Sequence, residues 1–335
     1  MIERAASLIY RRLSSAGSIL CFHDVAAAGL RSANDVHVPF EHFSQILDAV
    51  RDAGELVALS ELVERHLARR STAGLVALTF DDAYAGLVSI VDLVEHQSVP
   101  VSIFAVSSAA RDGDRFWWDR VDTVHRRTSP ERWRTFEDEL GLPEDYRRGQ
   151  PPSLGALRPL RQWVLSKHLG RWPNELEPTL ARLEHETGAY CSERSMTFEE
   201  LAAFAARGPV EIGVHTRSHP VLPFLEDEKL NQEVDGCYRD LRDRFENVIP
   251  VLAIPFGLCD ERTIRLARGA GMTASLTLAP ETLSRSAGKD WLPRFCMSAS
   301  EPTWKLRIRL SGAAEPWQRL IGRALAYPDL PSATT

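Results

Sequence analysis

The stretch LVALTFDD, residues 75–82, decides the fold. Its first six residues form a short apolar run without a helical period, which is typical of a strand buried on both faces of a parallel sheet. Two aspartates, Asp81 and Asp82, follow the run immediately. Helix-like segments precede and follow it, so residues 75–80 are expected to form one strand of a sheet whose strands alternate with helices.

The same rhythm extends over most of the chain. Further strands are expected at residues 18–22, 56–59, 101–106, 210–214, 251–254, 273–276 and 292–295. Helices are expected between them, at residues 41–53, 61–69, 85–96, 198–206, 227–245 and 261–268. This alternation predicts an α/β fold, a distorted (β/α) barrel with about seven strands.

One long segment, about residues 111–195, interrupts the rhythm. It contains Phe116, Trp117, Trp118 and Asp119 in a row, and helices are expected at 159–169 and 175–186. We interpret it as a helical insertion that caps one end of a single barrel domain spanning residues 1–312. Residues 313–335 are expected to form a C-terminal helix and a disordered tail.

Composition excludes some classes of function. The 335 residues are 26% charged and 44% hydrophobic, and the formal net charge is -6. A nucleic-acid-binding protein usually has a basic excess, which is missing here. The five cysteines are scattered without CxxC spacing, which favours reduced thiols in a reducing compartment.

The sequence also carries no recognisable export or membrane signal. Arginines interrupt residues 1–20, and no run reaches the roughly 18 apolar residues of a membrane span. Residues 2–13 fit an amphipathic helix, on the domain surface or on a membrane. We therefore expect a cytoplasmic protein, with attachment to the inner membrane face as the alternative; the oligomeric state is left open.

Polar residues follow several expected strands directly. They are His23 and Asp24, Asp81 and Asp82, His215 and His219, and Pro255, Phe256 and Gly257, while Arg294 lies within the last expected strand. In parallel α/β barrels the carboxyl ends of the strands open on one face, where the active site is built. These side chains are therefore expected to converge on one pocket.

His215 and His219 are spaced i, i+4, so on a helical turn both imidazoles would project to the same side. With a carboxylate they would form a metal site with open positions, although the pair alone is more typical of two histidines on a plain helix face. Asp81 and Asp82 could divide metal binding and proton abstraction, or serve as a helix N-cap and a first-turn acid. His23 could be a general acid or a structural histidine, and Asp24 could orient it or cap a turn.

Together these residues resemble the polysaccharide deacetylase family, which includes chitin and peptidoglycan N-acetylglucosamine deacetylases. TFDD (residues 79–82) looks like the family's first motif, HTRSHP (215–220) like its second, and PFG (255–257) is similar to its third. The first two motifs in this order are a specific combination. The resemblance covers about residues 18–110 and 196–300, and it implies the family's distorted barrel.

The resemblance also implies roles. Asp81 would be the catalytic base, Asp82, His215 and His219 the ligands of one divalent metal ion, and the Phe256 N–H an oxyanion donor. Zinc is the default for two histidines and an aspartate, with cobalt or nickel as alternatives. Pro255 and Gly257 would line the substrate site.

Two positions depart from the family's usual pattern. The acid histidine usually lies near the C-terminus, whereas here LCFHD (residues 20–24) supplies His23 from the first strand, as in the permuted branch that includes exopolysaccharide deacetylases. The usual arginine of the third motif is Ala253, and Arg294 is the hypothetical replacement that orients Asp81.

The expected function is metal-dependent removal of an N-acetyl group from an amino sugar in a glycan or glycan precursor. Alternatives are an amidohydrolase for a non-sugar amide and an inactive glycan-binding barrel. Trp117 and Trp118 could form a stacking platform for the sugar. They could equally anchor the insertion to the barrel.

Overall fold

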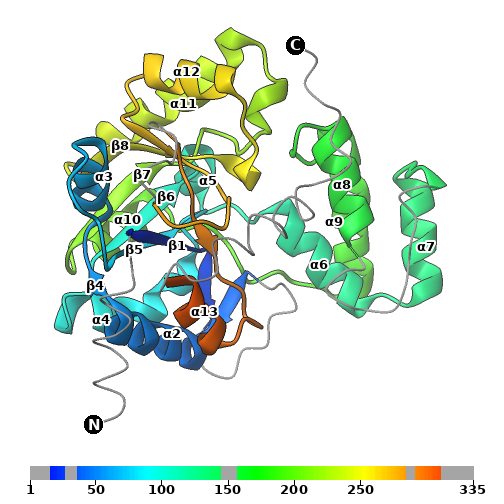
Figure 1. Ribbon diagram of the computed structural model, residues 1–335. Helices are drawn as coiled ribbons and strands as arrows, with labels where there is room; N and C mark the ends of the chain where they lie inside the picture. Colours follow the sequence, from blue (N-terminus) through cyan, green and yellow to red (C-terminus); the bar gives the residue numbers. More distant parts are fainter. Residues whose placement is uncertain (1–15, 27–35, 145–156, 284–290, 311–335) are drawn as a thin grey trace.

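The computed structural model describes residues 16–26, 36–144, 157–283 and 291–310. Its centre is one curled sheet in which every strand pair is parallel, with the strand order β10-β9-β8-β7-β6-β5-β1-β11 and the short β4 paired to β5 (Figure 1). The strands are β1 (Ser18–Phe22), β4 (Glu55–Leu56), β5 (Leu75–Phe80), β6 (Val101–Ala105), β7 (Val210–Val214), β8 (Val248–Ala253), β9 (Ala274–Leu276), β10 (Trp291–Leu292) and β11 (Phe295–Cys296). The expected distorted barrel is confirmed, with more strands than the seven expected.

The sheet curls because its two edge strands are neighbours in the chain. Only Pro293 and Arg294 separate β10, at one end of the sheet, from β11, at the other. A two-residue connection spans only a few ångströms, so the two edges must approach each other. The single strand expected at residues 292–295 was therefore wrong, because the chain leaves one edge and joins the other within these residues.

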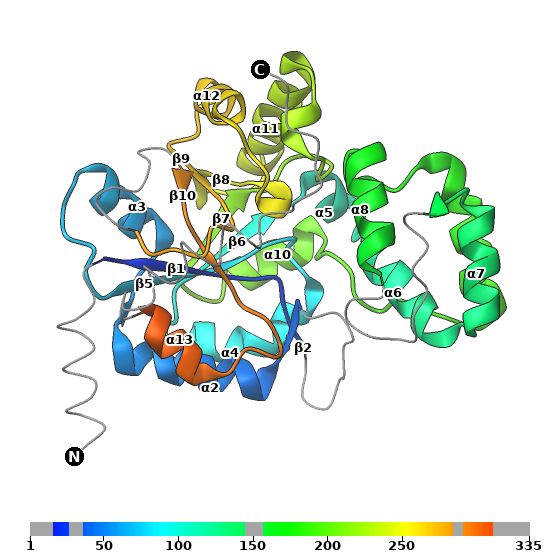
Figure 2. The same cartoon turned by 45° about the vertical axis from the view of Figure 1, so that its right-hand side comes forward.

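Helices cover the outside of the sheet, as Figure 2 shows for α2, α4 and α13 on one side and α11 and α12 on another. These helices and their neighbours are α2 (Phe40–Ala53), α3 (Leu59–Leu67), η1 (Ala85–Ile90), α4 (Val91–His96), α5 (Ser107–Asp112), α10 (Phe198–Ala205), α11 (Asp227–Arg242), α12 (Glu261–Gly269) and α13 (Thr303–Leu310). The expected helices are confirmed with two adjustments. Residues 85–90 form a 3-10 turn, and Leu59 begins α3 instead of ending a strand.

Strand alternation determines which side chains reach the inside of the curl. Ile19, Ala77 and Leu276, from strands far apart in the sheet, belong to one buried cluster, so that face is the inner one. Their chain neighbours Leu20 and Leu78 pack in the other cluster, under the helices. Because side chains alternate along a strand, residues two and four positions after an inner residue also point inward. This parity directs Cys21, Thr79 and Asp81 into the barrel.

The insertion is a group of helices beside the barrel, on the right in Figures 1 and 2. It comprises α6 (Trp117–Arg127), α7 (Pro130–Glu139), α8 (Arg158–Lys167), η3 (Asn174–Leu176) and α9 (Glu177–Thr187). The helices expected at 159–169 and 175–186 are confirmed, whereas α6 and α7 were not predicted. The group has its own buried cluster, which includes Trp133, Phe136 and Leu180. The division of the chain into domains stays a prediction, and the helices suggested for residues 2–13 and 313–335 lie outside the described residues. Among the described helices, none has the length and apolar character needed to cross a membrane.

A buried imidazole ties the insertion to the barrel. His37, in the two-stranded sheet of β2 (Asp24–Ala26) and β3 (His37–Pro39), contacts Asp24 Oδ2 at 2.9 Å through Nδ1 and Asp119 Oδ1 of α6 at 3.0 Å through Nε2. Burial alone would lower the pKa of His37, but the two carboxylates outweigh it and raise the pKa to about 10. His37 is therefore an imidazolium at neutral pH, held between two buried acids.

We expect His37→Ala to lower the free energy of unfolding by about 3–5 kcal/mol, because it leaves two buried carboxylates without their cation. Because the folded pKa of His37 lies above its ordinary value of 6.5, its contribution is complete below that pH and is lost as the pH rises through about 10. Urea unfolding between pH 6 and pH 11 measures this. The wild-type advantage should shrink toward alkaline pH, while the exposed-site control His185→Ala should follow the wild type throughout. A wild-type advantage that stays constant over this range would contradict the assignment.

Candidate active site

The carboxyl ends of the parallel strands bring together most of the polar residues singled out from the sequence. His23 follows β1, Asp81 and Asp82 follow β5, and His215 follows β7. Pro255, Phe256 and Gly257 form the 3-10 turn η5 after β8, and Arg294 lies between β10 and β11. The expected convergence on one end of the barrel is confirmed.

Asp82, His215 and His219 each offer one atom that could bind a metal ion, and these atoms lie within 4.8 Å of one another. The Nε2 atoms of His215 and His219 lie 3.5 and 3.6 Å from Asp82 Oδ1. Atoms bound about 2.0–2.1 Å from a tetrahedral zinc ion stand roughly 3.4 Å apart, so these separations suit one shared cation.

The surroundings of these atoms also fit a cation. Asp82 Oδ1 is buried and has no hydrogen-bond partner. Burial, reinforced by the Asp81 and Asp119 charges, raises the pKa of Asp82 well above its usual value, so its ionised form needs a compensating positive charge. Burial lowers the pKa of His215 and of His219, which keeps both imidazoles in the neutral form that binds metals.

His215 is oriented by a contact with the barrel wall. Its Nδ1 lies 2.8 Å from the carbonyl oxygen of Ala253. Since a carbonyl can only accept, Nδ1 carries the proton and the lone pair of Nε2 faces Asp82. Such an outer hydrogen bond is typical of metal-binding histidines.

The local structure of the second motif differs from the sequence prediction. Residues 215–220 form a loop without helical structure, in which Thr216 and His219 have φ of 65° and 56°. The helical-turn explanation of the i, i+4 pair was therefore wrong, because left-handed residues fold the loop back on itself. The loop is held by Glu233 of α11, which accepts from the backbone N–H and hydroxyl of Ser218, and by α5, whose Ser107 N–H donates to the Thr216 carbonyl.

The first motif also has special backbone geometry. Asp82 and Ala83 have φ of 66° and 50°, a region that non-glycine residues rarely adopt. The turn directs Asp81 and Asp82 to different neighbours. It also rules out the alternative in which the aspartates cap a helix, because the next helical residue is Ala85.

Arg294 supplies the charge that the third motif lacks. Its Nη1 and Nη2 donate to Asp81 Oδ1 and Oδ2 at 2.7 and 2.8 Å, and neither side chain is exposed appreciably. Burial alone would raise the pKa of Asp81, but Arg294 holds it far below its usual range. The guanidinium makes two further bonds, from Nε to the Thr277 carbonyl and from Nη1 to Thr79 Oγ1. The structure thus places Arg294 where the sequence suggested, on Asp81.

His23 lies beside this pair and is partly exposed. Burial of its ring lowers the pKa of His23 to about 4, although the nearby Asp81 charge opposes the shift. Asp24, which could have oriented His23, binds His37 instead, so that suggestion was wrong. The reason is strand alternation, which turns neighbouring side chains of the β1–β2 segment to opposite sides.

Aromatic rings surround His219. The ring centroid of His219 is 4.5 Å from that of Phe256 and 5.0 Å from that of Trp118. Phe116 stacks on Trp118, with their ring centroids 4.6 Å apart. Trp118 is partly exposed, and its indole N–H donates to the Tyr84 hydroxyl at 2.9 Å. We call Phe116, Trp118 and Phe256 the aromatic wall.

Trp117 has a different environment from Trp118. It is 8% exposed, belongs to the core of the insertion, and donates through Nε1 to the Gly170 carbonyl at 2.9 Å. This placement favours the anchoring alternative for Trp117. Gly170 in turn lies so close to the Phe256 ring that a Cβ there would be 2.5 Å from Cε2, so the insertion contacts η5 directly.

Three residues that hold the aromatic wall in place were not predicted from the sequence. Tyr84, Asp119 and His37 link Trp118 to the barrel, since the Tyr84 hydroxyl donates to Asp119, which also contacts His37. The only signal was an aspartate directly after an aromatic run, in FWWD. His37 lies among residues that have no periodicity, so nothing in the sequence marked it.

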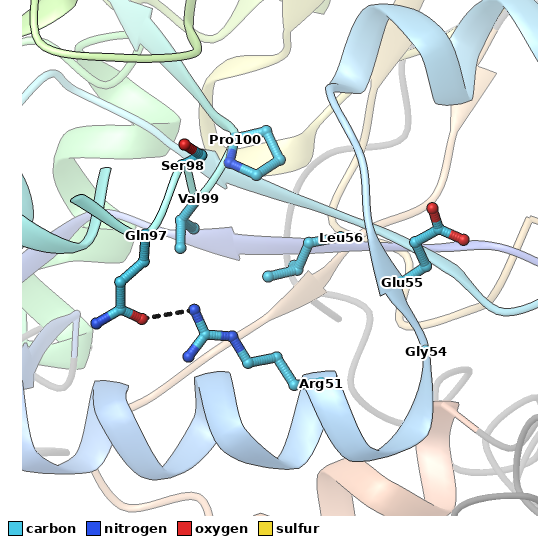
Figure 3. A pocket seen from close by; sticks show the side chains of 8 residues that line it. All are labelled: Arg51, Gly54, Glu55, Leu56, Gln97, Ser98, Val99 and Pro100. Atoms are coloured by element: carbon cyan, nitrogen blue, oxygen red, sulfur yellow. Dashed lines mark hydrogen bonds between the residues drawn. The ribbon is translucent and has the colours of Figure 1, made fainter. Parts of the chain in front are cut away.

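A separate hollow of about 370 Å³ lies at the opposite end of the barrel (Figure 3). It is lined by residues just before or at the start of strands β4 and β6, including Arg51, Leu56, Gln97 and Pro100. Arg51 donates to Gln97 Oε1 at 2.7 Å across it. Because active sites of such barrels lie at the carboxyl ends of the strands, we do not assign this hollow a catalytic role.

Comparisons with known proteins agree with this geometry. The sequence pattern of the family described as polysaccharide deacetylase matches residues 166–275, which contain the second and third motifs. A comparison with curated protein sequences gives no match. The pattern match, with the first motif placed beside the other two, shows that this part of the chain is similar to the polysaccharide deacetylase family.

The fold is similar to solved deacetylase structures. Streptococcus pyogenes deacetylase PplD, solved in complex with acetate, is 14% identical with a TM-score of 0.57, over 88% of this chain and 98% of that one. IcaB from Ammonifex degensii is 15% identical with a TM-score of 0.55, over 89% and 97%. A de-N-acetylase from Aggregatibacter actinomycetemcomitans is 13% identical with a TM-score of 0.53, over 87% and 99%. At these identities the likeness concerns the fold.

We expect Arg294→Met to lower the free energy of unfolding by about 3–5 kcal/mol, because it leaves the buried Asp81 carboxylate unpaired. The double variant Arg294→Met/Asp81→Leu should recover most of this loss, since both charges are then gone. Urea unfolding of the single and double variants measures the coupling. The exposed-pair control Arg207→Met should change little, and losses that simply add in the double variant would show that the pair is not coupled.

Proposed function

We propose that this protein is a divalent-metal-dependent hydrolase that removes an N-acetyl group from an amino sugar. The observation that carries the proposal is one buried cluster in which Asp82, His215 and His219 can share a cation while the adjacent Asp81 is held by Arg294. The similarity to the polysaccharide deacetylase family supports carbohydrate deacetylation, and the chemistry of the three candidate ligands supports the metal. Zinc is the expected ion, with cobalt or nickel as substitutes.

A cation held by Asp82, His215 and His219 would polarise the acyl carbonyl and acidify water, which even a weakly basic carboxylate can then deprotonate. Asp81 is such a base. Arg294 lowers its pKa and keeps it ionised, and the paired bonds to the guanidinium hold both of its oxygens in place. Asp81 would accept the proton of the water that attacks the acyl carbon.

Two further groups would serve the later steps. The backbone N–H of Phe256 lies near the start of η5, where N–H groups lack intrahelical partners, and it would donate to the developing oxyanion. His23 would protonate the departing nitrogen. Since burial lowers the pKa of His23 to about 4, it must gain its proton within the reaction, when negative charge develops beside it.

The aromatic wall supports a carbohydrate substrate. Phe116, Trp118 and Phe256 provide apolar ring surface around His219, next to the buried carboxylates. A sugar ring has one relatively apolar face that stacks on such surfaces, while its polar edge needs hydrogen-bonding groups. Pro255 and Gly257 flank Phe256 in η5 and would shape the same side.

We expect the metal-loaded wild type to release acetate from N-acetylated amino-sugar oligomers, and a chelator to abolish this until metal is restored. Asp81→Asn should abolish turnover but bind as much metal per chain as the wild type, because Asp81 is not a ligand. His215→Ala should lose turnover and the ion held by Asp82, His215 and His219. Acetate release and metal content per chain are the two measurements.

The exposed histidine His185 provides a matched control, since His185→Ala should keep both properties. Equal loss of metal in Asp81→Asn and His215→Ala would contradict the division of roles. Acetate release only from non-sugar amides would contradict the carbohydrate substrate.

We expect Trp118→Ala to raise KM for an oligomeric substrate about tenfold or more with a smaller change in kcat, because stacking on one ring contributes about 1–2 kcal/mol to binding. Trp304→Ala is the control, since Trp304 is 61% exposed on α13 and should leave both constants unchanged. Steady-state kinetics decide. Unaltered KM in Trp118→Ala would remove the aromatic wall from substrate binding.

A further inference from the structure

Two cysteines stand side by side next to the proposed catalytic base. Cys21 on β1 and Cys296 on β11 are direct partners in the parallel ladder between these strands. Their Cα atoms are therefore about 4.7–4.9 Å apart and both side chains point to the same face. A side-chain hydrogen bond joins the two thiols, and neither of them is in a disulfide.

His23 completes a group of three metal-ligating side chains. The Sγ atoms of Cys21 and Cys296 and a ring nitrogen of His23 lie within 4.8 Å of one another. His23 Nδ1 is buried and has no hydrogen-bond partner, which is uncommon for a polar atom inside a protein. Two thiolates and an imidazole are the donors that zinc and other thiophilic ions select.

We propose that Cys21, His23 and Cys296 form a second cation site, separate from the set of Asp82, His215 and His219, that takes Zn²⁺ or a similar thiophilic divalent ion. Three protein ligands leave a fourth position for water. Cys296 is partly exposed, so the ion can reach the site from solvent. Binding releases the two thiol protons, since thiolates are the ligands.

Occupation of this site inhibits the reaction, a consequence that rests on the proposed function. A ring nitrogen of His23 that binds the ion cannot deliver a proton to the leaving nitrogen. The Cys21 thiol also donates to Asp81 Oδ2 at 3.5 Å, and this bond is lost when the thiol ionises. Excess zinc therefore prevents His23 from acting as the acid, and it also removes the hydrogen bond from Cys21 to the base Asp81.

Cobalt distinguishes the two sites, because a thiolate bound to Co²⁺ absorbs strongly in the near ultraviolet and the set of Asp82, His215 and His219 contains no sulfur. The reduced full-length chain is titrated with Co²⁺ and its metal content is measured. We expect two ions per chain with the thiolate absorption for the wild type. Cys21→Ser/Cys296→Ser and the single variant Cys296→Ser should lose the absorption and one ion.

Cys259→Ser is the matched control, because Cys259 is also a partly exposed free thiol but lies outside the cluster, so it should keep both ions and the absorption. One ion per chain without thiolate absorption in the reduced wild type overturns the second site, as does absorption that survives in Cys296→Ser. These measurements need no turnover. A chain that binds two ions but releases no acetate would overturn the proposed function and leave the second site standing.

Discussion

The buried ion pair of Asp81 and Arg294 is the interaction on which the rest of the site depends. A guanidinium without solvent contact is costly unless its charge is paired and its N–H groups are hydrogen-bonded, and here Asp81, Thr79 and the Thr277 carbonyl accept four bonds from it. These partners belong to or follow β5 and β9, while Arg294 connects β10 to β11. The pair therefore joins the connection between the two edge strands to the carboxyl end of β5, where the chemistry is proposed.

The cluster of Asp82, His215 and His219 depends on this arrangement through one turn of backbone. Asp81 continues the inward parity of β5, and the left-handed conformation of Asp82 sends the next carboxylate elsewhere, toward the two histidines. Adjacent acids thus obtain opposite environments. One has a depressed pKa beside an arginine, and the other has a raised pKa beside neutral imidazoles. Such a separation is the usual physical basis for different roles of neighbouring carboxylates.

The helical insertion forms part of the same site. Its Asp119 contacts the His37 imidazolium, and its Gly170 packs on Phe256. Its Phe116 and Trp118 are two of the three residues of the aromatic wall. The buried pairing of His37 with two carboxylates makes this attachment strong at neutral pH. The surface that would contact a substrate is consequently shared by two segments, the barrel and the insertion, that have separate cores.

The strand–helix rhythm, the parallel barrel and the candidate metal ligands Asp82, His215 and His219 could be predicted from the sequence. This was possible because buried strands are continuous apolar runs and polar residues at their carboxyl ends must meet on one face. Tertiary structure alone decided how the histidine pair converges, since the left-handed residues Thr216 and His219 have no local sequence signal. It also decided that Cys21 adjoins Cys296 and that Asp24 and Asp119 share His37. These residues are tens to hundreds of positions apart, and only strand pairing and the docking of the insertion bring them into contact.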